Sequence, residues 1–237
     1  MSKRNVYPTF DLDWANEQQI NFLIDMLIEN KIKATFFVTH YSEAVQKIID
    51  KKELFEVGIH PNFLENSTHG KNFEVVINYF KDWIPSPIGV RTHGLYNTSN
   101  YFIEIMKKCS SIQYDASTYL PYADNVRPYR FEYEGRSIYK IIFNWEDDLE
   151  FAVKKPIWHM NSLLEKISGP IILNFHPVHI FYNNAAKADV LEAKTMDIDL
   201  TKRRANFSGA LVMLNSLIAC KENLNVGVLS ECINFGK

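Results

Sequence analysis

Two aspartates near the N-terminus, Asp11 and Asp13, follow a short segment rich in β-forming residues. Side chains alternate along a strand, so residues two apart share a face, and both carboxylates would lie together where the strand ends. Adjacent negative charges repel each other, so the pair makes sense if a cation lies between them or if one carboxylate holds a proton. The alternative is an Asp-rich turn that starts a helix.

Other apolar, strand-like segments are also followed by side chains that could take part in chemistry. These are His60 after residues 55–59, with His69 in the next loop, Arg91 and His93 after 88–90, and His176 and His179 after 171–175. Because the carboxyl ends of parallel strands meet at one end of a barrel or one edge of a sheet, we expect these groups to converge.

One carboxylate and two imidazoles form a three-ligand site for Zn²⁺ or a similar ion and leave a position open for water. A second carboxylate can then accept the proton of the water, an arginine can keep this base ionised, and a histidine can protonate the leaving group. Residues of the right types for these roles are Asp13, His60 and His69 as ligands, with Asp11, Arg91 and His176.

Several further residues are weaker candidates. His93 shares a face with Arg91, and His179 shares one with His176, so His93 could contact substrate and either His176 or His179 could be the acid. A carboxylate of the segment 145–148 could hold His176 protonated, or it could cap a helix. Aromatic side chains that could stack on a sugar are Tyr96, Tyr119, Tyr122 and Trp145, although aromatic residues as often pack in cores.

The elements that must position these residues alternate along the chain. Strands are predicted at 6–10, 34–39, 54–59, 88–91, 112–116, 137–145, 171–175 and 226–229, with helices at 17–29, 42–51, 73–83, 100–107, 158–167 and 208–219. Residues 129–133 are expected to pair with 137–145 as a hairpin. Seven or eight β/α units in 237 residues predict an α/β fold with a closed or nearly closed parallel barrel, and a doubly wound open sheet is the main alternative. No shift in composition divides the chain, so residues 1–237 are expected to form a single domain.

Composition excludes several classes of protein. Hydrophobic residues make up 46% of the chain and aromatic residues 14%, which is enough for a core, and the net charge of −2 gives no basis for binding nucleic acid. The cysteines, Cys109, Cys220 and Cys232, form no Cys-x-x-Cys motif or disulfide framework. We find no signal peptide and no apolar run long enough to span a bilayer, so we expect a soluble cytoplasmic protein.

Four segments resemble the motifs of the NodB-homology polysaccharide deacetylases (carbohydrate esterase family four). Residues 9–13 resemble the first motif in its Asp-x-Asp variant, 56–60 the start of the second, 89–91 the third and 172–177 the last. The strings His-Pro-Asn-Phe, Arg-Thr-His and Phe-His-Pro-Val-His resemble the WbmS-like branch, which is associated with surface-polysaccharide gene clusters.

The resemblance implies a distorted (β/α)7 barrel that hydrolyses an N- or O-acetyl group of a sugar in surface-polysaccharide or O-antigen biosynthesis. It implies Asp11 as the base, Asp13 and His60 as metal ligands, Arg91 as the residue that orients Asp11, and His176 as the acid. The family places a second histidine four residues after the first, but position 64 is leucine here, so His69 is the expected third ligand.

Zn²⁺ is the expected metal, with Ni²⁺, Co²⁺ or Fe²⁺ as alternatives, and the acetylated sugar could be nucleotide-linked. His93, Trp145 and His179 are the expected substrate contacts. Two other functions stay open: hydrolysis of a non-sugar amide at the same site, and sugar binding by a barrel whose catalytic site has decayed.

Overall fold

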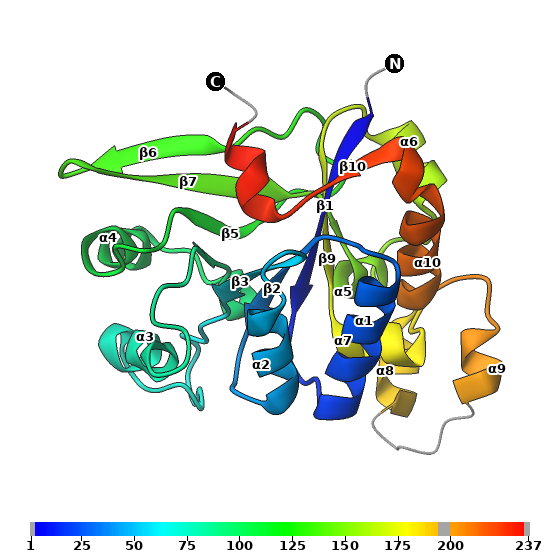
Figure 1. Cartoon of the computed structure of the whole chain (residues 1–237), viewed down its shortest axis with the longest axis horizontal. Coiled ribbons are helices and arrows are strands. Elements are labelled where there is room, and N and C mark those ends of the chain that lie inside the picture. Colours follow the sequence, from blue (N-terminus) through cyan, green and yellow to red (C-terminus); the bar gives the residue numbers. More distant parts are fainter. Residues whose placement is uncertain (1–2, 194–199, 235–237) are drawn as a thin grey trace.

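The computed structural model describes residues 3–193 and 200–234, and its centre is a mostly parallel sheet (Figure 1). The parallel strands are β1 (Arg4–Asp11), β2 (Ala34–Val38), β3 (Phe55–Ile59), β4 (Gly89–Val90), β5 (Tyr114–Tyr119), β7 (Arg136–Phe143), β8 (Trp145–Glu146) and β9 (Ile171–Phe175). Their spatial order is β7-β5-β4-β3-β2-β1-β9-β8. Antiparallel β6 (Tyr129–Tyr133) extends β7 as the predicted hairpin.

The sheet closes through one interrupted strand. A single residue, Asn144, separates β7, which pairs with β5, from β8, which pairs with β9. At this break the Asn144 side chain accepts a hydrogen bond from the backbone N–H of Ile172, 2.9 Å away. If β7 and β8 are counted as one strand, seven parallel strands of this path form the barrel. This confirms the predicted distorted (β/α)7 fold and rules out the open sheet.

Helices cover the outside of this barrel (Figure 1). They include α1 (Glu17–Glu29), α2 (Glu43–Asp50), α3 (Phe73–Lys81), α4 (Ser99–Lys108), α6 (Met160–Lys166) and α10 (Ala210–Cys220). The first of them begins at a capping box, in which Asn16 and Gln19 each bond the other's backbone N–H, and it buries the apolar stripe that predicted it.

Shorter helical segments occupy several loops. They are η1 (His93–Leu95), α5 (Asp147–Glu150), α7 (Pro177–Tyr182), α8 (Lys187–Ala193), α9 (Leu200–Arg204), η2 (Lys221–Asn223) and η3 (Leu229–Asn234). The predicted last strand, 226–229, is displaced, because β10 (Leu224–Val226) pairs with the start of β1 and the chain then turns into η3. Part of the expected single domain 1–237 lies outside the described residues.

Two apolar cores hold the fold together, one between strands and helices and one inside the barrel. Leu229 and Cys232 of η3 belong to the inner core, which also contains Tyr7, Phe37 and Tyr114. In Figure 1 the red η3 lies toward the end of the barrel where β1 begins. The loops at the opposite end, after the carboxyl ends of the strands, carry the predicted site.

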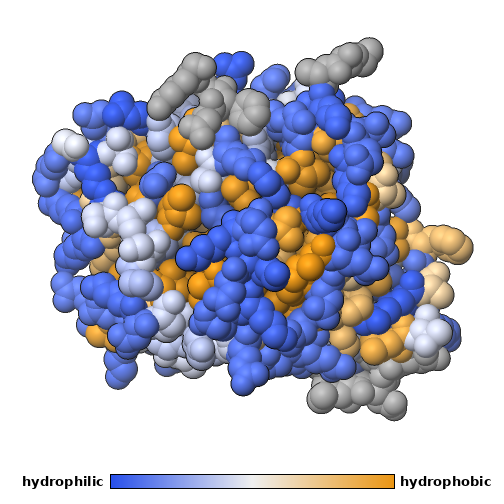
Figure 2. All heavy atoms as spheres, in the orientation of Figure 1, coloured by the Kyte–Doolittle hydropathy of each residue, from blue (hydrophilic) through white to orange (hydrophobic). Residues whose placement is uncertain are grey.

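The outer surface is mixed in character. The face in Figure 2 shows hydrophilic side chains with apolar ones between them. Across residues 3–193 and 200–234, no helix combines the length and the apolar character needed to cross a membrane.

Candidate active site

A pocket of about 330 Å³ opens at the carboxyl ends of the strands. The ionisable residues that line it include Asp11, Asp13, His60, His93, Glu146 and His176. They come from β1, β3, β4, β8 and β9 or from the residues that follow these strands, as the convergence argument predicted.

Asp13, His60 and His93 form one group of potential metal ligands, in which the donor atoms lie within 4.8 Å of one another. Asp13 Oδ2 is 2.8 Å from His60 Nε2 and 3.0 Å from His93 Nδ1. Although His60 is buried, neither of its ring nitrogens has a partner in hydrogen-bond geometry among the described residues. Buried ring nitrogens without a hydrogen bond, beside a carboxylate and a second imidazole, fit the ligands of a divalent cation such as Zn²⁺.

The electrostatics of this group are those of a carboxylate held ionised. Burial alone would raise the pKa of Asp13, but the neighbouring His60 and His93 bring it well below its usual range. Burial opposes the charged form of His60, yet the carboxylates of Asp13 and Asp11 raise its pKa. The pocket therefore favours a positive charge next to Asp13, which a metal ion would also supply.

His69, the expected third ligand, does not belong to this group of donor atoms. Its Nδ1 accepts a hydrogen bond from the backbone N–H of Asn62 at 3.1 Å, and its ring also bonds the backbone of Thr39. The ring stacks on Tyr79 with centroids 4.6 Å apart. His69 thus fastens its own loop, and His93, predicted as a substrate contact, takes the place beside Asp13 and His60.

Asp11 lies deeper and is held through both of its oxygens. Arg91 Nη1 donates to Oδ1 at 3.0 Å, and Asn174 Nδ2 donates to Oδ2 at 2.9 Å. The guanidinium of Arg91 is fully buried, and its centre lies 4.4 Å and 4.5 Å from the ring centroids of Phe37 and Phe143. Such a sandwich fixes the arginine, which in turn orients the Asp11 carboxylate.

His176 is held in place by Asp147, the first residue of α5. One oxygen of Asp147 lies 2.8 Å from His176 Nδ1, and the other accepts the backbone N–H of His176 at 2.8 Å. Burial disfavours the imidazolium, but the Asp147 carboxylate outweighs it and raises the pKa of His176 well above its ordinary value. Nε2 is the ring nitrogen left for the pocket, so a protonated His176 can donate there.

His179, an expected substrate contact, is not among the residues that line the pocket. It is 1% exposed, its Nδ1 bonds the Asn184 amide at 2.9 Å, and its Nε2 is 3.5 Å from Asp148. Between the two histidines, only His176 lines the pocket, which favours His176 as the acid.

Trp145, another expected substrate contact, does not line the pocket either, because its side chain is in the core. It is 0% exposed, and its Nε1 donates to the carbonyl of Ile157. The next residue, Glu146, points the other way and lines the pocket, as alternation along a strand requires. Burial, together with the nearby Asp11 carboxylate, raises the pKa of Glu146 to about 7.

Trp14 also lines the pocket, and it was not among the residues predicted from the sequence. It is 67% exposed, with a φ of 56° that is rare for a bulky side chain. Its indole stacks on His176 and meets His93 edge-on, with ring centroids 6.0 Å apart in both cases. A strained, exposed aromatic residue between these two histidines is positioned to contact a ligand. The available signal was its place directly after Asp13 in the loop that follows β1.

Comparisons with known proteins agree with this architecture. A family model for WbmS-like polysaccharide deacetylases matches residues 8–193. Among solved structures, the chain is similar to a candidate polysaccharide deacetylase involved in O-antigen biosynthesis from Bordetella bronchiseptica, with 24% identity, a TM-score of 0.78, and coverage of 92% of this chain and 91% of that one.

The chain is also similar to the peptidoglycan deacetylase PdaC of Bacillus subtilis, with 14% identity, a TM-score of 0.50, and coverage of 98% of this chain and 91% of that one. At these identities the structural likeness shows the fold alone. No curated protein matches the sequence.

Proposed function

The chain belongs to the WbmS-like polysaccharide deacetylases, and we propose that it uses a divalent metal to hydrolyse an acetyl group on a sugar. The observation that carries the proposal is that one pocket contains the Asp13, His60 and His93 group, an Asp11 fixed by Arg91, and a His176 fixed by Asp147.

Asp13, His60 and His93 are the residues that would hold the metal. Two imidazoles and one carboxylate suit Zn²⁺ first, and Ni²⁺, Co²⁺ or Fe²⁺ next. Bound there, such an ion would polarise the acetyl carbonyl and lower the pKa of a coordinated water.

Asp11 is the proposed general base. Arg91 and Asn174 each occupy one direction at a carboxylate oxygen, and every such oxygen can accept more than one hydrogen bond. Asp11 can therefore accept the proton of the attacking water while it stays fixed. Its burial keeps bulk water from competing for that proton.

His176 is the proposed general acid. Asp147 fixes the orientation of the ring and favours its charged form, so a proton is available at Nε2 when the bond between the acetyl carbon and the sugar nitrogen or oxygen breaks. The leaving amine or hydroxyl takes that proton, and acetate remains. Trp14, stacked on His176, would cover the sugar ring on this side of the pocket.

The biological setting is proposed from similarity. The Bordetella bronchiseptica protein is described as involved in O-antigen biosynthesis, and we propose a surface polysaccharide or its precursor as the substrate here. The cytoplasmic location expected from the sequence stays a prediction.

Metal analysis combined with turnover tests this proposal. The wild-type protein should bind about one divalent ion per chain, Asp13→Ala should lose it, and Asp11→Asn should keep it while turnover of acetylated sugars falls by orders of magnitude. Glu165→Gln, on the exposed side of α6, is the control and should change neither property.

Three outcomes would contradict the proposal. Full turnover in Asp11→Asn would exclude the base. Sugar binding without metal or turnover would indicate a decayed site, and hydrolysis of small amides in place of acetylated sugars would indicate the other substrate class.

A further inference from the structure

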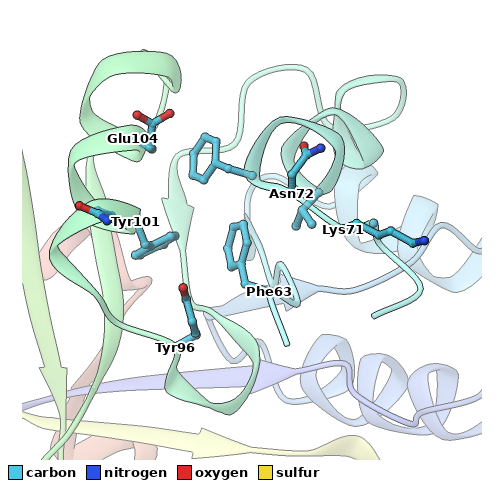
Figure 3. A pocket seen from close by; sticks show the side chains of 10 residues that line it. Phe63, Lys71, Asn72, Tyr96, Tyr101 and Glu104 are labelled. Atoms are coloured by element: carbon cyan, nitrogen blue, oxygen red, sulfur yellow. The ribbon is translucent and has the colours of Figure 1, made fainter. Parts of the chain in front are cut away.

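A second pocket of about 220 Å³ lies between the start of α3 and helix α4 (Figure 3). Its apolar wall is aromatic and consists of Phe63, Phe73, Tyr96 and Tyr101. In Figure 3 the labelled Tyr96 and Tyr101 approach from one side and Phe63 from the other, with Asn72 and Glu104 above them.

The aromatic wall is rigid. Phe63 stacks on Phe73 with centroids 5.7 Å apart and an interplanar angle of 10°, and it meets Tyr101 edge-on at 5.2 Å. Thr92 Oγ1 donates to the carbonyl of Tyr96 at 2.8 Å, which fixes the loop that carries this tyrosine. A ligand would meet rings that are already in place, so binding would cost little side-chain entropy.

Polar groups on the rim carry little net charge. Lys71 has no ion pair with any described residue, while Glu104 on the opposite side is paired with Lys108. Asn72 uses its side-chain oxygen to cap α3 and leaves its amide N–H groups for another partner, and Asn100 lies on the rim from α4. Aromatic faces with amide donors, a single lysine and one paired carboxylate suit the C–H faces and hydroxyls of an uncharged sugar, whereas a pyrophosphate would need more positive charge.

Residues close together in the sequence line the second pocket and the catalytic pocket. His93 and Leu95 line the catalytic pocket and Tyr96, the next residue, lines the second one. Likewise, His60 lines the catalytic pocket and Phe63, three residues later, lines the second pocket. Three residues span at most about 11 Å, a distance that a short oligosaccharide covers.

We propose that the aromatic pocket binds a neighbouring sugar of the same glycan, so that the substrate is an oligosaccharide rather than a single nucleotide-linked sugar. The inference rests on the proposed function, because it assumes that the acetylated residue occupies the catalytic pocket. The acetylated sugar lies beside Asp13, His60 and His93, and the glycan then runs over η1 to Tyr96 and Phe63.

Calorimetric binding to the Asp11→Asn protein tests this inference without consuming the ligand. The probes are N-acetylglucosamine, its β-1,4-linked oligomers up to the tetrasaccharide, and acetylated bacterial oligosaccharides with their matched monosaccharides. We expect at least one oligosaccharide to bind about tenfold or more tightly than its monosaccharide.

Two variants test whether the tighter binding of the oligosaccharide comes from the aromatic pocket. Tyr96→Ala removes one ring, and Asn100→Trp fills the pocket from an exposed position without removing any core ring. Both should abolish the advantage of the longer ligand and leave monosaccharide affinity unchanged, while Phe131→Ala, an exposed aromatic position on β6, should have no effect. The inference is wrong if no oligosaccharide exceeds its monosaccharide, or if the advantage survives in both variants. Failure of the proposed function would appear separately, as full turnover in Asp11→Asn.

Discussion

Replacement of Glu146 by glutamine should make the metal-free protein more stable at alkaline pH. Glu146 is 7% exposed, and its Oε1 accepts a hydrogen bond from Asn174 Nδ2 at 2.9 Å. A glutamine has the same shape as the protonated carboxyl group, and its side-chain oxygen can accept the same bond. The variant therefore keeps the contact and removes only the charge.

The size of the effect follows from the pKa of Glu146, which is raised from 4.5 to about 7 in the folded protein. The favourable contribution of this group is complete below the unfolded pKa and is lost as pH rises through the folded pKa. One pKa unit corresponds to about 1.4 kcal/mol. The raised pKa of Glu146 should thus lower the free energy of unfolding, relative to a group that stays neutral, by about 1 kcal/mol at pH 5 and by about 3 kcal/mol at pH 8.

Urea unfolding of both proteins in the presence of a chelator measures this difference. The stability advantage of Glu146→Gln over wild type should grow by roughly 2 kcal/mol between about pH 5 and pH 8. Glu165→Gln, at an exposed position on α6, should show no such growth. If the advantage of Glu146→Gln does not depend on pH, the raised pKa is wrong and Glu146 is ionised at a lower pH than its surroundings imply.

Three further predictions concern the catalytic pocket. His93→Ala should lower metal affinity by about 100-fold or more, while the folded fraction of His69→Ala should retain the metal. If elemental analysis shows equal losses of metal in the two variants, His69 is a ligand as well. Asp147→Asn should move the alkaline limb of the pH profile of kcat to lower pH, because the carboxylate raises the pKa of His176, and an unmoved limb would exclude His176 as the acid. Trp14→Ala should raise KM by about tenfold with little change in kcat, and Trp14→Phe should recover most of the loss; a fall in kcat alone would contradict a role in binding the sugar.

Much of the site could be predicted because it depends on two regular features of structure. Alternation along β1 places Asp11 and Asp13 together, and parallel strands bring their carboxyl ends to one mouth. His60, Arg91 and His176 each follow a strand directly, so little chain separates them from the barrel. Their convergence required only that the strands be identified and that the sheet close.

The position of His93 beside Asp13 and His60 could not be predicted, because it depends on the path of a loop. His69 and His93 both lie near Asp13 in the fold, and the charges of Asp13, His60 and His93 all influence the pKa of His69. What separates them is hydrogen bonding: His69 is committed to backbone groups of its own loop and of Thr39, whereas His93 Nδ1 faces Asp13. No local pattern in the sequence encodes that difference.

Trp145 and Glu146 show how a shift of one residue reverses an assignment. Both end the interrupted strand, and the sequence favoured the aromatic residue because tryptophan stacks well on sugars. Asn144, however, breaks the strand, and in β8 it is Glu146 that faces the pocket while Trp145 packs on Phe175. A strand of two residues has too little periodicity to fix its own register from sequence.

Asn174 links Asp11, Arg91 and Glu146 through its side-chain amide. Its Nδ2 donates to Asp11 and to Glu146, each at 2.9 Å, and its Oδ1 accepts from Arg91 and Thr9. One neutral amide thereby bonds to two carboxylates and to one nitrogen of a guanidinium, in a region where an unpartnered charge would be very unfavourable. Because Asn174 lies two residues before His176 on the same short stretch of chain, β9 fixes the position of Asp11, the proposed base, and leads directly into His176, the proposed acid.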